Sequence, residues 1–137
     1  FGPAANVREA IEKLNVRRIQ HGARAIEDDS VVALLKEVDA TLDLCPISNL
    51  KLQVFSAMKD HPARLFFDQG IRCTLSTDDT FSFGNSLTDE YEVLAEHLHF
   101  TAAELSHIAK NGFDVADIED DLRNQALIDI DQLGSAV

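Results

Sequence analysis

Tryptophan is absent from the sequence, and tyrosine, methionine, cysteine and proline are all scarce. The two cysteines, Cys45 and Cys73, cannot form the framework of several disulfides that stabilises small secreted domains, and both lie in short apolar runs. No apolar run approaches the ~20 residues of a membrane-spanning helix, and the first residues lack the basic start and apolar core of a signal peptide. We therefore expect a cytoplasmic protein with reduced cysteines and no membrane contact.

Basic residues are scarce as well, with 12 lysines and arginines against 24 aspartates and glutamates and a formal net charge of −12. The sequence contains no basic stripe, so we expect no binding to nucleic acid. With 137 residues, 45% of them hydrophobic, the chain is long enough for one ordinary domain with a sizeable core. It has no internal repeat, low-complexity tract or Ser/Gly linker, and we therefore expect residues 1–137 to form a single unit.

Helical and extended patterns alternate along the chain. Helices are predicted, from apolar spacing and capping residues, at 4–14, from Asp28–Ser30 onwards, at 61–70, after the capping boxes Ser86-x-x-Asp89 and Thr101-x-x-Glu104, and at 119–133. Short strands are predicted at 16–20, 40–44 and 71–75. This alternation indicates the α/β class, with crossover helices joining parallel strands that lie in chain order.

Polar residues follow each predicted strand. His21 ends the first strand and precedes Gly22, which lets a ligand or the backbone approach closely. A Cys-Pro pair with Ser48 and Asn49 follows the second strand, and Asp78 follows the third. Because α/β barrels carry their sites at the carboxyl ends of the strands, we expect His21 and Asp78 at the same end of the sheet. A lone histidine is often structural, and that interpretation of His21 stays open.

Two adjacent aspartates, Asp78 and Asp79, are unusual directly after an apolar strand, because like charges repel and each loses hydration there. A bound cation or polar ligand would remove this penalty. If the strand alternation continues to Asp78, its carboxylate lies on the same face as Thr74 and Ser76 and points towards a barrel mouth. The alternative is that the pair forms an N-cap or an Asx turn at the start of a surface loop.

The His-Leu-His segment at 97–99 is similar to the metal-binding His-x-His pair of metal hydrolases. That pair works at the end of a strand, where residues two apart point the same way. Here it closes a predicted helix, in which residues two apart diverge. We expect this segment, and also His61 and His107, to be structural.

Four segments carry a resemblance to a known family: "RIQHG", "LCPISNLKL", "HPARLFFDQGI" and "LSTDDTFSFGNSLTDEY". In this order and spacing, over about residues 5–115, they resemble the adenosine/adenine deaminase family of zinc-dependent purine aminohydrolases. The resemblance implies a (β/α)8 TIM barrel of which this chain is the C-terminal part, about half. It also implies one Zn²⁺ per complete site and hydrolytic deamination of a 6-aminopurine, adenosine or adenine, to inosine or hypoxanthine.

The resemblance further implies a role for three residues. Asp78 matches the zinc-ligating aspartate, Asp79 the aspartate that hydrogen-bonds the purine ring, and His21 the histidine that orients and deprotonates the zinc-bound water. The Cys-Pro-x-Ser-Asn motif lies near the family's pocket, without an assigned role here. The family's other zinc ligands and its proton-donating glutamate are absent from the sequence, so we expect the chain alone to be inactive and to self-associate or to require a missing N-terminal half.

Two alternatives remain open at this stage. The first is another metal-dependent hydrolase of the same barrel superfamily, acting on an amide, ester or pyrimidine. The second is a non-catalytic half-barrel that functions by association. Within the deaminase reading, "CPISNLKLQVF" followed by "HP" favours adenine over adenosine as the substrate.

Overall fold

The computed structural model describes residues 2–134, which form eight α-helices, two 3-10 helices and three strands. The α-helices are α1 (Ala4–Leu14), α2 (Asp29–Glu37), α3 (Pro46–Lys51), α4 (Ala63–Asp68), α5 (Thr80–Phe83), α6 (Leu87–Leu98), α7 (Ala102–Asp114) and α8 (Asp120–Gly134). The strands are β1 (Arg18–Gln20), β2 (Thr41–Leu44) and β3 (Arg72–Leu75), and the 3-10 helices are η1 (Ala23–Glu27) and η2 (Met58–Asp60).

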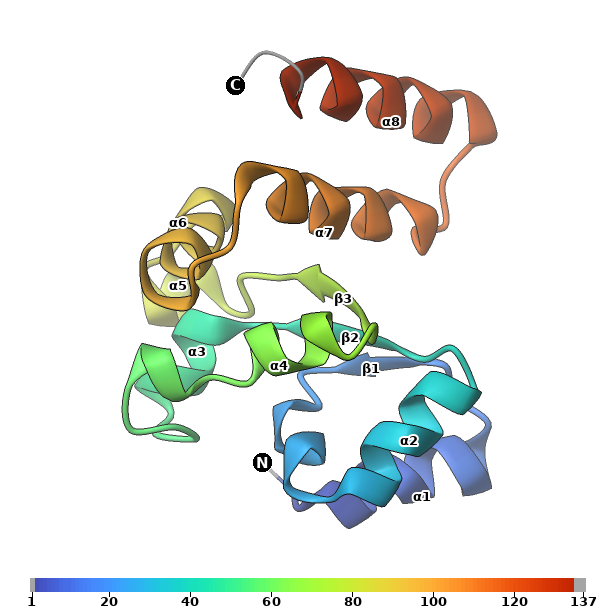
Figure 1. Ribbon diagram of the computed structural model, residues 1–137, viewed down its shortest axis with the longest axis vertical. Coiled ribbons are helices and arrows are strands. Elements are labelled where there is room, and N and C mark those ends of the chain that lie inside the picture. The colour runs from blue at the N-terminus through green and yellow to red at the C-terminus, as the bar shows by residue number, and fades with distance from the viewer. Residues whose placement is uncertain (1, 135–137) are drawn as a thin grey trace.

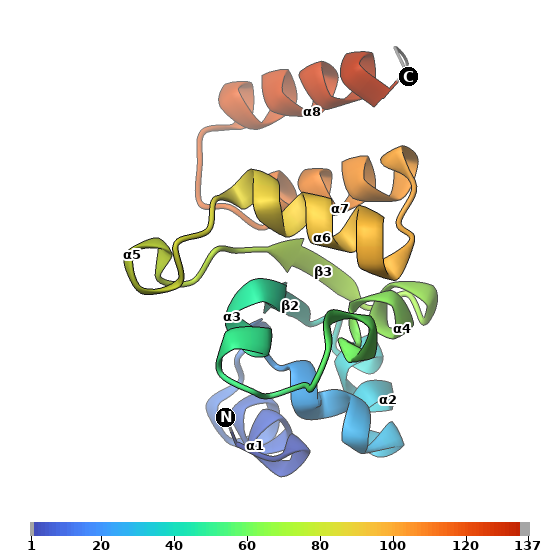
Figure 2. The same ribbon diagram turned by 90° about the vertical axis from the view of Figure 1, so that its left-hand side faces the viewer.

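The three strands form one parallel sheet in the order β1-β2-β3, which confirms the predicted order and direction. Helices α1 and α2 pack together below β1, and α6 and α7 lie above β3 (Figure 1). Figure 2 shows the same layers from the side, with α8 outermost against α7. The sheet is therefore covered by helices that come from both ends of the chain.

The two faces of the sheet differ in chemistry, as strand alternation predicts. Leu42 and Cys73 belong to the hydrophobic core under the helices. On the opposite face Asp43 of the central strand accepts hydrogen bonds from Arg18 Nε of β1, at 2.8 and 3.1 Å, and from Thr74 Oγ1 of β3, at 2.5 Å. One buried carboxylate thus links all three strands across the polar face.

Helix boundaries follow their capping residues. Both predicted capping boxes are present, Ser86 with Asp89 at α6 and Thr101 with Glu104 at α7. The helix predicted at 61–70 is shorter in the structure: α4 starts after Pro62, and the chain leaves it before Gly70, whose φ is +74°. Helices α3 and α5 were not predicted, because four to six residues are too few to show a helical period.

Within residues 2–134, no helix combines the length and apolar character needed to cross a membrane.

Candidate active site

His21 and Asp78 meet where β1 and β3 end. His21 Nε2 lies 3.5 Å from Asp78 Oδ2, which confirms the prediction that the two residues lie at the same end of the sheet. The backbone N–H of His21 donates to the carbonyl of Asp43 at 2.8 Å, so the sheet hydrogen bonding continues to the histidine. Both residues have left-handed backbone, with φ of 61° and 58°. Residues other than glycine adopt the left-handed backbone conformation at a steric cost, and such strain is concentrated at functional sites.

Helix α3 adds a third residue to this cluster. It begins directly after β2, and Ser48 in its first turns is fully buried. The Ser48 hydroxyl donates to Asp78 Oδ2 at 2.6 Å. The Cys-Pro-x-Ser-Asn motif therefore contacts the candidate site through its serine, a contact that sequence reasoning did not assign.

The other members of that motif have structural surroundings. Cys45 is buried, and burial raises the pKa of its thiol to about 11, so the thiol is protonated at neutral pH. Asn49 lies with its side-chain amide 3.3 Å from His61 Nε2. The structural reading of His61 agrees with this geometry, since His61 is itself buried inside the fold.

Asp79 lies at the N-terminus of α5. Its Oδ1 accepts hydrogen bonds from the backbone N–H groups of Phe81 and Ser82, at 3.0 and 3.1 Å, and its Oδ2 accepts from the Ser82 hydroxyl. These hydrogen bonds, above all those from Ser82, lower the pKa of the Asp79 carboxyl. Asp79 is thus the N-cap that the alternative interpretation described, and a contact with purine stays a prediction.

Glu90 is a buried acidic residue that sequence reasoning missed. It is fully buried on α6, where its carboxylate accepts from Ile47 N at 3.1 Å and from Asn85 Nδ2 at 2.6 Å. Burial raises the pKa of Glu90 to about 7. A signal was present in the sequence, because Glu90, Leu94 and Leu98 are spaced four residues apart and share the buried face of the helix.

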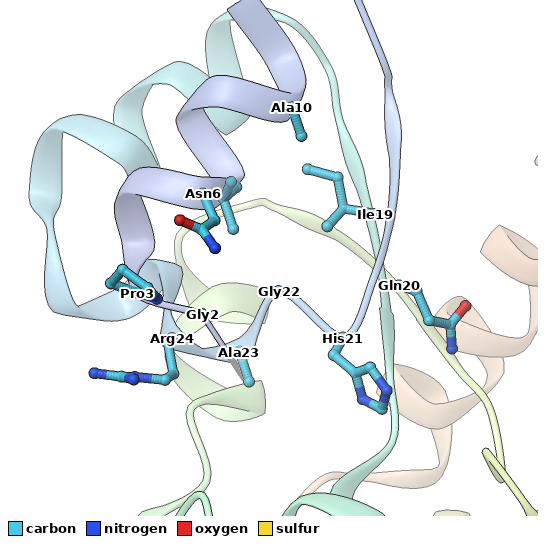
Figure 3. A pocket seen from close by; sticks show the side chains of 11 residues that line it. Gly2, Pro3, Asn6, Ala10, Ile19, Gln20, His21, Gly22, Ala23 and Arg24 are labelled. Carbon is cyan, nitrogen blue, oxygen red and sulfur yellow. The ribbon is translucent and has the colours of Figure 1, made fainter. Parts of the chain in front are cut away.

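A pocket between α1 and the end of β1 includes His21 in its lining. It has a volume of about 410 Å³ and is lined by α1 residues, including Asn6 and Ala10, and by Ile19 and His21. Figure 3 shows the imidazole of His21 directed away from Asn6. Asp78 does not line this pocket, so the histidine stands between the pocket and the carboxylate.

The cluster of His21, Ser48 and Asp78 contains only some of the ligands that a metal ion needs. Asp78 offers a carboxylate and His21 an imidazole, both of which are zinc ligands in proteins. Among residues 2–134, however, no group of three or more His, Cys, Asp or Glu side chains could hold a metal ion. Catalytic zinc sites use three protein ligands. The described residues therefore fit one side of a zinc site and cannot complete it.

The family model described as adenosine deaminase matches residues 1–133. The chain belongs to the adenosine deaminase family. It is 39% identical over 122 residues to the adenine deaminase of Marinomonas sp. strain MWYL1, covering 89% of this chain and 36% of that relative. It is 36% identical over 132 residues to the adenine deaminase of Streptomyces coelicolor, covering 95% of this chain and 39% of the relative. The chain thus spans less than two fifths of either relative.

The crystal structure of adenine deaminase from Arthrobacter aurescens has the same fold. It superposes with a TM-score of 0.91 at 31% identity, over 96% of this chain and 40% of that one. As a member of the adenosine deaminase family, the chain is therefore α/β and forms the C-terminal part of a (β/α)8 TIM barrel, as the resemblance implied.

Proposed function

We propose that the complete protein is a zinc-dependent purine aminohydrolase that converts adenine to hypoxanthine and releases ammonia. The observation that carries the proposal is the contact of His21 and Asp78 at the strand ends, 3.5 Å apart. We propose adenine rather than adenosine as the substrate because the relatives with 35–39% identity are named adenine deaminases. In the purine ring the amino group that leaves is attached to an electron-poor carbon, which water attacks.

Asp78, His21 and Asp79 each have a proposed task. Ser48 and His21 both approach Oδ2 of Asp78, and Asp78 would be the residue of this cluster that holds the zinc ion. When bound, zinc lowers the pKa of water towards 7. His21 accepts the proton of the attacking water at Nε2, a transfer that suits an imidazole at neutral pH. Asp79 accepts a hydrogen bond from a ring N–H of the purine, since a carboxylate has acceptor capacity beyond its capping bonds.

The site needs residues from outside the described segment. Within that segment β1 pairs only with β2, and its other edge can accept a further strand. The chain covers only 36–40% of the relatives named above. We propose that another part of the polypeptide, or a second copy of the chain, supplies the remaining ligands and the proton donor, and that residues 1–137 alone are inactive.

The test uses the full-length protein that contains this segment. Asp78→Asn should lose bound zinc. His21→Ala should retain zinc and lose roughly 10²–10⁴-fold in turnover, the usual contribution of general base catalysis. Asp114→Asn and His97→Ala, which alter an exposed aspartate and an exposed histidine, serve as matched controls and should change neither value. The measurements are metal analysis and ammonia release from adenine.

Three results would contradict the proposal. Full zinc occupancy in Asp78→Asn would refute the ligand assignment. A much higher kcat/KM for adenosine than for adenine would reverse the choice of substrate. Chelator-sensitive ammonia release by the isolated 137-residue chain would show that no further residues are needed.

A further inference from the structure

Glu90 occupies a position that an apolar residue would be expected to fill. It lies on the same face of α6 as Leu94 and Leu98, and all three are buried. A buried carboxylate is costly unless it is well hydrogen-bonded, and leucine in this row would avoid the cost. The carboxylate therefore calls for an explanation other than packing.

The two hydrogen bonds of Glu90 lead to the two segments that hold Asp78. Oε1 accepts from the Asn85 amide, and the same amide nitrogen donates to the carbonyl of Thr77 at 3.1 Å. Thr77 directly precedes Asp78 in the chain. Glu90 thus fixes, through one intermediate residue, the backbone from which Asp78 projects with its left-handed φ.

The second route passes through α3. Oε2 of Glu90 accepts from the backbone N–H of Ile47 in the first turn of that helix. The next residue, Ser48, donates its hydroxyl to the Asp78 carboxylate. The backbone of Asp78 and the serine that orients its side chain are therefore anchored to one carboxylate.

We propose that Glu90 is a positioning residue, whose carboxylate sets the place and orientation of Asp78 by holding both the Thr77 carbonyl side and the Ser48 side of the site. The inference rests on the proposed function insofar as Asp78 is taken to bind zinc. Burial raises the pKa of Glu90, and the hydrogen bonds from Ile47 and Asn85 lower it in part, because they favour the charged carboxylate. Glu90 itself contacts neither Asp78 nor His21 through a described hydrogen bond.

The test is Glu90→Gln in the full-length zinc-loaded protein. Glutamine has the same size but only one acceptor oxygen, so one of the two N–H donors would face another donor. We expect zinc affinity, measured by competition with a chelator, to fall roughly 10–100-fold, which is the usual effect of changing a residue that orients a metal ligand through hydrogen bonds. In the metal-free protein, amide hydrogen exchange across residues 76–79 should accelerate roughly tenfold or more.

The matched control is Thr101→Ala. It removes the capping box of α7 and so destabilises the fold without touching the Asp78 network. It should leave zinc affinity and exchange at 76–79 within about twofold of the parent. Should Glu90→Gln fail to fold, Asn85→Ala, which cuts only the Thr77 route, decides by the same two measurements.

The outcomes separate this inference from the proposed function. Unchanged exchange at 76–79 together with unchanged zinc affinity in Glu90→Gln would overturn the positioning role. Equal changes in Thr101→Ala would also overturn it, because the effect would then be general loss of stability. If the parent binds no zinc, the proposed function fails, and accelerated exchange at 76–79 in Glu90→Gln alone still supports the positioning of Asp78.

Discussion

His61 lies in the interior, with only 4% of its surface exposed, beside the edge of the Phe55 ring at a centroid distance of 5.2 Å. Its Nδ1 accepts a hydrogen bond from the backbone N–H of Ala63 at 3.2 Å. The other ring nitrogen, Nε2, lies 3.3 Å from Nδ2 of Asn49. Burial lowers the pKa of His61 from 6.5 to about 4. Acidification should for this reason destabilise the fold.

The sign and size follow from proton linkage. Between pH 6.5 and about 4 the unfolded chain takes up a proton at His61 that the folded chain does not, so stability is full above 6.5 and is lost as the pH falls. Each pKa unit corresponds to about 1.4 kcal/mol, and the whole loss from this group amounts to about 3 kcal/mol. Most of it, about 2 kcal/mol, should appear between pH 7 and 5.

Urea denaturation at a series of pH values measures this loss. His61→Gln keeps an amide that can hydrogen-bond to Asn49 but does not titrate, so its stability should fall by about 2 kcal/mol less than that of the parent over the same range. His97→Gln, a change at an exposed histidine, should keep the parent's slope. An identical pH dependence in His61→Gln and the parent would refute the reasoning. So would an NMR titration of folded protein in which His61 has a midpoint at or above 6.5.

Two further predictions concern packing and backbone conformation, and both are measured by urea denaturation. Phe66→Ala should lower the free energy of unfolding by roughly 3–5 kcal/mol because Phe66 is fully buried. Phe81→Ala, at a side chain that is 98% exposed, should change it by less than about 0.5 kcal/mol. Equal losses of stability in the two variants would contradict the burial argument. Gly22→Ala should cost more than Gly70→Ala, because both glycines have positive φ but only at Gly22 would the added Cβ meet a neighbour, Leu42 Cδ2 at 2.8 Å. Equal costs would mean that backbone strain alone decides.

The sheet could be predicted from the sequence because its signals are local. Short apolar runs rich in Val, Ile and Leu alternate with amphipathic helices, and this alternation is typical of a parallel sheet whose strands are joined by crossover helices. Two helices escaped prediction for an equally local reason. The six residues of α3 and the four of α5 contain too few apolar positions to define a period.

The candidate site was predictable only in part. The placement of His21 and Asp78 at the same end of the sheet follows from topology, since the carboxyl ends of parallel strands lie at one edge. The contact of Ser48 with Asp78 depends on how α3 packs, which no sequence spacing encodes. Glu90 was missed because glutamate on a helix is expected to face solvent. The signal for its burial was its four-residue spacing from Leu94 and Leu98 on one helix face.

Cys45 and Cys73 have a practical consequence, because they are the only two cysteines in the chain and both are buried. Burial raises the pKa of their thiols to about 11 and about 12, so neither reacts with an alkylating reagent at neutral pH while the fold is closed. Pulsed alkylation read by mass spectrometry would thus follow opening of the native state without an engineered probe. Cys45 reports on the junction beside the candidate site and Cys73 on the interior of β3. A difference between their labelling rates would reveal whether the site end opens before the sheet.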